Sequence, residues 1–259
     1  MNIIKTKEGW NIIEGDSHVG KWIQDTGKLN HDEFLIPIAC ANIKAGDIVI
    51  DCGALYGDHT IAYAHKVGNE GCVLAIEANP IAFKCLTENA KKFTGPTICM
   101  NLALCEFHGG TAVHIMDEQN IGASKVSDIL DASYINAKIE KEVRTASIDG
   151  IVHDANLDKV NFIKMDVEGW EYKTLLGARR TIEKFKPILL IEMNFGTLQI
   201  QGADYKMIYD FLIELNYSWR IVQPELKGGD AQYDVMAWPN LVERLKPIRL
   251  ASELPYLKP

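Results

Sequence analysis

The stretch Asp51-Cys52-Gly53-Ala54-Leu55-Tyr56-Gly57-Asp58-His59-Thr60 decides the fold class. Residues 47–50 before it predict a short buried strand, and residues 60–66 after it predict the start of a helix. A strand that passes through a glycine-bearing turn into a helix forms a nucleotide-binding corner. Glycine lets the backbone approach a ligand, and the helix N-terminus offers free N–H groups. We therefore expect a bound cofactor at this corner.

A second signal lies twenty residues beyond Gly57, where Glu77 ends another predicted strand at 72–77. A carboxylate at the end of that strand can accept hydrogen bonds from both ribose hydroxyls of an adenosine. The order of strand, glycine turn, helix, strand and Glu77 is more specific than the glycines alone. It favours an adenosine-containing cofactor.

The glycine spacing separates the candidate cofactors. A dinucleotide fold uses G-x-G-x-x-G, whereas this chain has Asp51-x-Gly53-x-x-x-Gly57. The carboxylate of Asp51 repels a pyrophosphate and suits a ligand with a positive amino group. S-adenosylmethionine (SAM) has an ammonium, a sulfonium and a ribose, so it is the expected cofactor. The alternative is a structural glycine turn in an ordinary α/β protein.

The composition limits the class of fold, the partners and the cellular compartment that fit these motifs. The 259 residues are 47 % hydrophobic and 24 % charged, which suits one large α/β core. The net charge of −8 and the lack of a Lys/Arg run disfavour nucleic acid and anionic membranes as partners. No apolar stretch has membrane-spanning length and the N-terminus lacks a signal-peptide core, so a cytoplasmic protein is expected. The six cysteines include no C-x-x-C pair and are typical of a reduced core.

The chain divides into two parts. Residues 1–45 form a front segment with one helix over about 31–41, a possible substrate lid. Residues 46–259 form the SAM-binding domain, a doubly wound, mainly parallel seven-stranded sheet with an antiparallel terminal strand, Rossmann-like in type. Strands are expected at 47–52, 72–77, 97–101, 111–116, 143–148, 160–166, 187–193, 217–222 and 233–238. Helices are expected at 58–67, 80–93, 149–155, 169–185 and 204–215.

Two connecting segments carry separate expectations. Residues 117–142 have no clear period and are a candidate loop or lid. The turn Gly228-Gly229-Asp230 predicts that the last two strands pair antiparallel at a sheet edge.

The motif Lys164-Met165-Asp166-Val167-Glu168-Gly169 carries the predicted chemistry. Asp166 ends a strand, and ligands of open α/β sheets bind outside the carboxyl ends of the strands. A carboxylate there can deprotonate or orient a hydroxyl, or help hold a metal. Glu192 and Asn194 at the next strand end complete an oxygen-rich rim for sugar hydroxyls or Mg²⁺, or else bond to loop backbone. Both alternatives stay open.

Other residues have two possible roles. His18 lies in a cluster of polar, cationic and aromatic types with Lys21 and Trp22, which either folds over a cleft to contact a sugar or forms a surface turn. His59 either contacts the methionine part of the cofactor, acts as a base, or packs. Asp149 and Glu171 are expected to cap or charge the first turns of their own helices.

In order and spacing, the motifs resemble those of the FkbM-type methyltransferases over roughly residues 45–195. They are Asp51-x-Gly53-Ala54-x-x-Gly57, Glu77-x-Asn79-Pro80, Asn101-x-Ala103-Leu104 and Lys164-x-Asp166-Val167-Glu168-Gly169-x-Glu171. The resemblance implies a class I SAM-dependent fold and O-methylation of a hydroxyl on a sugar or natural product. Two positions depart from the family pattern, Leu55 in the glycine turn and Ala78 after the acidic residue.

The resemblance also implies that Asp51, Gly53, Gly57 and Glu77 bind the cofactor. The expected cofactor-binding residues are Asp51, Gly53, Ala54, Gly57, His59, Thr60, Glu77, Ala78, Asn101 and Asp166.

The sequence therefore predicts a SAM-dependent O-methyltransferase that acts on a hydroxyl of a sugar, glycan or small natural product. The enzyme would hold oxygen, methyl and sulfur in line. The candidate catalytic residues are Asp166, Glu168, Glu192 and His18. A divalent metal is possible but is not predicted. The alternatives are a catalytically silent SAM-binding module and, less favoured, a nucleotide-dependent oxidoreductase.

Overall fold

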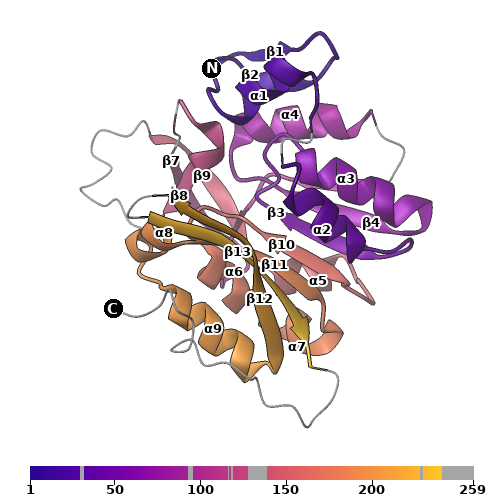
Figure 1. The fold of residues 1–259 in the computed structure, drawn as a ribbon, viewed down its shortest axis with the longest axis vertical. Helices are drawn as coiled ribbons and strands as arrows, with labels where there is room; N and C mark the ends of the chain where they lie inside the picture. Colours follow the sequence, from indigo (N-terminus) through magenta and orange to yellow (C-terminus); the bar gives the residue numbers. More distant parts are fainter. Residues whose placement is uncertain are drawn as a thin grey trace.

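A computed structural model describes residues 1–29, 32–92, 96–115, 117, 119–127, 139–227 and 230–240. A seven-stranded sheet in the order β12-β13-β11-β10-β3-β4-β5 forms its centre (Figure 1). Five strands run parallel, and β13 runs antiparallel to both of its neighbours. The strands are β3 (Ile48–Cys52), β4 (Cys72–Ile76), β5 (Thr97–Met100), β10 (Phe162–Met165), β11 (Ile188–Asn194), β12 (Tyr217–Lys227) and β13 (Asp230–Pro239).

The predicted sheet is confirmed, with one refinement at its end. The last strand in the chain, β13, lies between β11 and β12, so the antiparallel strand is inside the sheet and β12 forms the edge. The expected pairing of the two strands extends from Tyr217↔Pro239 to Lys227↔Asp230. Residues 228 and 229 of the predicted turn lie outside the described residues.

Helices cover both faces of the sheet. Val49 of β3 packs with Tyr63 and Val67 of α3, whereas Ile50 belongs to the core on the opposite face. This alternation follows from the period of two along a strand, and it explains why the parallel strands are apolar on both sides. One face carries α2 (Leu35–Ala41), α3 (Asp58–Val67) and α4 (Pro80–Ala90). The other carries α5 (Ile148–Asp154), α6 (Glu171–Leu176), α7 (Arg179–Phe185) and α9 (Tyr205–Glu214).

A second sheet of four strands, in the order β6-β9-β7-β8, lies beside the main one (Figure 1). Its strands are β6 (Ala103–Leu104), β7 (Gly110–Ile115), β8 (Lys125–Ser127) and β9 (Ile139–Ala146). Two strands predicted near 111–116 and 143–148 belong to this small sheet. Residues 117–142, expected to be a loop or lid, contain some regular structure, namely β8, the start of β9 and a 3₁₀ turn η2 (Ile121–Ala123). Residues 128–138 of that loop lie outside the described part.

The front segment contains structure that the sequence did not indicate. A hairpin of β1 (Ile3–Lys5) and β2 (Asn11–Ile13) precedes helix α1 (Val19–Thr26). The buried side chain of Asn89 on α4 accepts a hydrogen bond from the Asn11 backbone N–H at 2.8 Å and donates to the Tyr56 carbonyl at 2.9 Å. The hairpin, which lies beside α4 (Figure 1), is thereby fastened to the glycine corner. The predicted helix at 31–41 begins at Leu35.

The long helix predicted at 169–185 is two helices, α6 and α7. They separate at Gly177, where a Cβ atom would lie 2.0 Å from the Cys105 carbonyl oxygen. Asp149 does not cap its own helix as expected, since Ser147 does so through the Gly150 N–H. The Asp149 carboxylate instead accepts from the N–H groups of Arg180 and Thr181 in the first turn of α7. A further helix, α8 (Phe195–Ile200), was not predicted.

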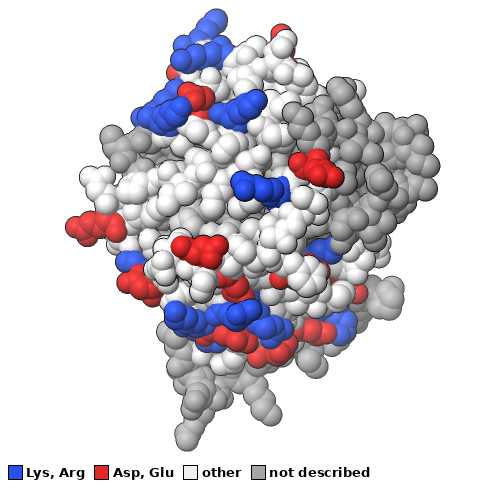
Figure 2. All heavy atoms as spheres, turned by 180° about the vertical axis from the view of Figure 1, so that it is seen from behind, with Lys and Arg blue, Asp and Glu red and all other residues white. Residues whose placement is uncertain are grey.

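Charged residues of both signs share the surface. On the face shown in Figure 2, basic side chains lie beside acidic ones near the upper and lower edges, with a largely uncharged band between them. Among the described residues, no helix is both long and apolar enough to cross a bilayer.

Candidate active site

The glycine corner is packed against the next strand of the sheet. Gly53 has a φ of +78°, and a Cβ atom there would lie 1.7 Å from the carbonyl oxygen of Asp166. Only glycine tolerates both the left-handed backbone and this contact. Gly57, with a φ of +94°, starts α3. Gly53 therefore lets the ends of β3 and β10 approach closely, and Gly57 lets the chain turn into α3.

Glu77 fixes the turn beside this corner. Its two carboxylate oxygens accept hydrogen bonds from the Leu55 N–H at 2.8 Å and the Asn79 N–H at 2.7 Å. Burial raises the pKa of Glu77 to about 7. Asn101 supports the same turn from β5, where its side-chain amide donates to the Glu77 and Ala78 carbonyls. The carboxylate keeps unused lone pairs at the edge of a cavity.

A buried lysine links the two acidic strand ends. The Lys164 ammonium lies 3.1 Å from Asp166 Oδ2 and 3.8 Å from Asp51 Oδ1. The second Asp51 oxygen accepts from the Thr60 hydroxyl at 2.5 Å. Burial lowers the pKa of Lys164, but the adjacent carboxylates outweigh burial and raise it. Lys164 belonged to the predicted motif without a role, and its contact with Asp51 depends on β10 lying next to β3.

A cavity of about 440 Å³ opens over the ends of these strands. It is lined by seven of the predicted site residues, which are His18, Gly53, Glu77, Ala78, Asp166, Glu168 and Glu192. A smaller cavity of about 180 Å³ shares Gly53, Asp166 and Glu192 and includes His59. The lining residues of the two cavities do not include the other predicted residues, which are Asp51, Ala54, Gly57, Thr60 and Asn101.

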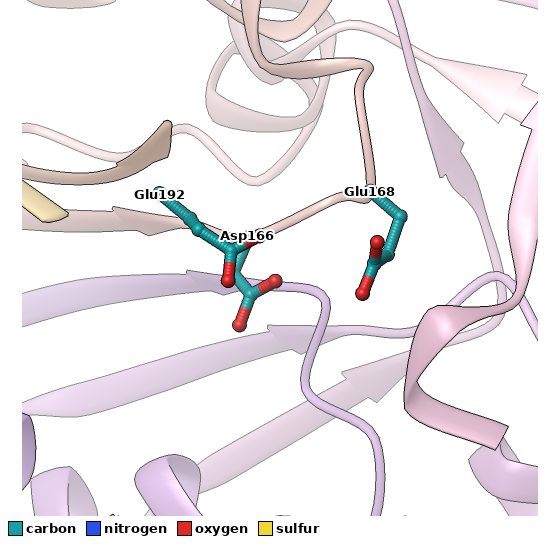
Figure 3. Close-up of side chains that lie close together, drawn as sticks. All are labelled: Asp166, Glu168 and Glu192. Carbon is teal, nitrogen blue, oxygen red and sulfur yellow. The ribbon is translucent and has the colours of Figure 1, made fainter. Parts of the chain in front are cut away.

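Three carboxylates converge at the junction of the two cavities. Asp166, Glu168 and Glu192 each offer an oxygen within 4.8 Å of the others (Figure 3). Burial, with Asp166 and Glu171 nearby, raises the pKa of Glu168 to about 8. The pKa of Glu192 is raised well above its usual range by burial and by the same group of carboxylates. Such oxygens can share a hydroxyl proton, and as hard ligands they fit a divalent cation.

The neighbours of this group differ from the predicted rim. Asn194 caps α8, where its side-chain oxygen accepts from the Thr197 N–H, so Glu168 takes the place expected for Asn194. Glu171 braces the loop by accepting from the Val167 and Gly169 N–H groups. Gln232 on β13, which sequence reasoning missed, donates to Glu192. No local signal marks Gln232, because its role depends on β13 lying next to β11.

The front segment reaches the mouth of the large cavity. His18 and Trp22 both line it, from the start and the middle of α1. Asp16 anchors this helix, since it accepts from the Gly20 N–H at 2.7 Å and from the Tyr56 hydroxyl at 3.0 Å. Ser17 donates to the Gln119 carbonyl of the segment before η2. Two segments far apart in sequence therefore meet at the cavity.

Comparison with known proteins is consistent with this geometry. The methyltransferase FkbM domain matches residues 51–219, more than half of the chain. The hexuronic acid methyltransferase AglP of Haloferax volcanii is 26 % identical over 196 residues, covering 75 % of this chain and 73 % of AglP.

Two solved structures are also similar. A methyltransferase FkbM from Methylobacillus flagellatus has a TM-score of 0.49 at 18 % identity, covering 74 % of this chain and 43 % of that one. A Streptococcus mutans protein in complex with S-adenosylhomocysteine (SAH) has a TM-score of 0.49 at 11 % identity, covering 79 % and 94 %.

The extent of the domain match agrees with the strand order and with the positions of Glu77 and Gly53. Together they exclude the alternative of a nucleotide-dependent oxidoreductase. The chain belongs to the FkbM methyltransferase family and is a SAM-dependent methyltransferase.

Proposed function

We propose that the acceptor is a hydroxyl group of a sugar, a glycan or a small natural product, and that the methyl group is transferred to oxygen. The observation that carries this proposal is the convergence of Asp166, Glu168 and Glu192 at the junction of the two cavities. Carboxylates are the usual hydrogen-bond acceptors for sugar hydroxyls, and one of them can take the hydroxyl proton as the oxygen attacks. The sugar acceptor in the name of AglP supports the same class.

The reaction needs little covalent chemistry from the protein. The acceptor oxygen attacks the methyl carbon as the carbon–sulfur bond breaks, and the sulfonium becomes the neutral thioether of SAH. The protein holds the three atoms in line and excludes water. In our proposal Asp166 receives the hydroxyl proton, and Lys164, 3.1 Å away, holds that carboxylate in place. A divalent cation, if held by Asp166, Glu168 and Glu192, would polarise the acceptor hydroxyl.

The acceptor class can be tested by incubating the protein with SAM and a panel of neutral glycosides, amino sugars and uronic acids. Mass spectrometry would detect the methylated product, and brief mild alkali would distinguish the two kinds of oxygen. A methyl ether survives this treatment, whereas a methyl ester on a uronic carboxyl is cleaved. We expect a methyl ether. A product lost entirely in alkali would reject transfer to a hydroxyl.

A further inference from the structure

Acidic side chains outnumber basic ones around the two cavities. Among the described residues, the walls of the cavities include seven carboxylates, which are Asp32, Asp58, Glu77, Asp166, Glu168, Glu192 and Asp234. The same walls contain one lysine, Lys164, and no arginine. The side chains of Asp166 and Asp32 are 37 % and 17 % exposed, so a ligand in the cavities can approach both. Such a ligand therefore meets mainly negative charge.

The single lysine is already compensated by the protein. The Lys164 ammonium lies 3.1 Å from Asp166 Oδ2 and 3.8 Å from Asp51 Oδ1. Burial raises the pKa of Glu168 and Lys125 on β8 opposes that rise, but Lys125 lines neither cavity. Among the described lining residues, no lysine or arginine is therefore left to bind an anion.

His59 in the second cavity also stands between carboxylates. Its Nε2 atom lies 3.7 Å from Asp32 Oδ2 and 3.9 Å from Asp58 Oδ2, and its Nδ1 atom bonds with the Tyr63 hydroxyl at 2.8 Å. Burial alone would raise the pKa of Asp32, but hydrogen bonds from His59 and from two backbone N–H groups lower it. Asp32 is therefore charged at neutral pH, and a protonated His59 would already face two carboxylates.

The bound cofactor does not reverse this balance. SAM has an ammonium, a sulfonium and a carboxylate, and so contributes one net positive charge. Burial raises the pKa values of the three lining glutamates, so the negative charge near neutral pH comes mainly from the four lining aspartates. These aspartates still outnumber the positive groups when SAM is bound. A further carboxylate placed among them is disfavoured, and partial burial limits the screening by salt.

We infer that the acceptor carries no carboxylate and is a neutral or amino-bearing sugar, not a uronic acid. Carboxylate oxygens accept hydrogen bonds from the hydroxyl groups of a neutral sugar, and they attract an ammonium, whereas they repel a uronate. In this respect the chain differs from AglP, whose name states a hexuronic acid as the substrate. The inference rests on the proposed sugar acceptor and narrows it.

The test compares a glucoside, the matching glucuronide and the methyl ester of that glucuronide, with the same three derivatives in the galactose and mannose series. The ester keeps the shape of the uronic group and removes its charge. Calorimetry measures the binding of each ligand to the SAH complex, and SAH formation from SAM gives kcat/KM. In both measurements we expect the glucuronide to be worse than the glucoside by about 10²-fold or more, and the ester to recover most of the loss.

Asp234→Asn tests the source of this discrimination. The change removes one negative charge from the wall of the second cavity and nearly keeps the shape of the side chain. The preference for the glucoside over the glucuronide should shrink by about 3- to 10-fold. Asp32→Asn should act in the same direction and carries the test if Asp234→Asn does not fold. Asp210→Asn is the matched control on α9, because its side chain is 55 % exposed and lines neither cavity.

The outcomes separate this inference from the proposed function. Methyl ether formed equally well on the glucuronide and the glucoside, with or without added Mg²⁺, would reject the inference and leave the proposed function in place. An ester as poor as the glucuronide, or an unchanged preference in both aspartate variants, would reject charge as the cause. If no ligand binds in any series, the proposed sugar acceptor is rejected and the inference is rejected with it.

Discussion

The glycine corner and the mouth of the large cavity, where the start of α1 meets the segment before η2, are built in different ways. The corner is local: Gly53, Gly57 and Glu77 lie within 25 residues of one another and set two turns by their own chemistry. The mouth of the cavity joins residues that are far apart in sequence, such as Ser17 and Gln119, which share one hydrogen bond. Short motifs therefore set the backbone of the corner, whereas the mouth of the cavity is assembled by packing between distant segments.

Gly53→Ala should give the largest effect, because it breaks the corner itself. The added Cβ meets a backbone carbonyl at 1.7 Å in a left-handed conformation. We expect a loss of about 3–5 kcal/mol in the free energy of unfolding, combining backbone strain with overpacking. Chemical denaturation would measure it. Gly46→Ala is the matched control, since Gly46 has a similar φ of +82° but no atom within 4 Å. Equal losses in the two variants would refute the packing argument.

Asp166→Asn tests the group of three carboxylates formed by Asp166, Glu168 and Glu192. The change keeps the shape of the side chain and removes the proton acceptor, so turnover should fall by about 10²-fold or more. Affinity for SAH should stay within a few-fold, as titration calorimetry would show. Wild-type turnover in this variant would remove Asp166 from the mechanism.

Glu77→Ala tests the cofactor side alone. The variant loses a carboxylate that accepts hydrogen bonds from two turns and that we expect to bind the ribose, so SAH binding should weaken by about 1.5–3 kcal/mol, the range for hydrogen bonds to a charged group. Glu70→Ala, at an exposed position after α3, should leave binding unchanged. An affinity within two-fold of the wild type by calorimetry would show that the ribose is held elsewhere.

The front segment should give a smaller, acceptor-specific effect. His18→Ala and Trp22→Ala should raise the acceptor Michaelis constant or lower turnover severalfold, while SAH affinity changes little. Trp22 also packs against the core that contains Ile23 and Tyr56. A thermal melt separates the two roles, since a large drop in melting temperature with normal kinetics at low temperature would make Trp22 a packing residue. The acceptor site would then be sought in residues 117–142.

The pH dependence of stability gives a further test. Burial raises the pKa of Glu77 and of Glu171 to about 7 in the folded protein. Because the folded pKa lies above the unfolded one, their stabilisation is complete below about pH 4.3 and is lost as the pH rises to about 7. The melting temperature of the ligand-free protein should therefore fall over this range, as calorimetric melts at several pH values would show. Glu171→Gln should flatten the slope, and an unchanged slope would contradict the assignment.

The sequence by itself determined the sheet, the glycine corner and the strand-end carboxylates. An apolar strand followed by Gly53 and Gly57 indicates the backbone conformation of only a few residues. The pattern at 47–60 was therefore sufficient to predict the glycine corner. The strands predicted at 160–166 and 187–193 indicated Asp166, Glu168 and Glu192, because the carboxyl ends of parallel strands lie at one edge of the sheet. Spacing could not distinguish Glu77 and Glu168, which line the cavity, from Asp51 and Thr60, which do not.

Which side chains contact one another depended on the tertiary structure. Lys164 acquires its role because β10 lies next to β3, and Gln232 because β13 lies next to β11. His114 and Trp170 line the same cavity although they are 56 positions apart in sequence. Asp149 likewise serves a helix that begins 30 residues later. Local propensity fixes the conformation of a segment, but the partner of a side chain depends on which segments pack together, and packing is a property of the whole chain.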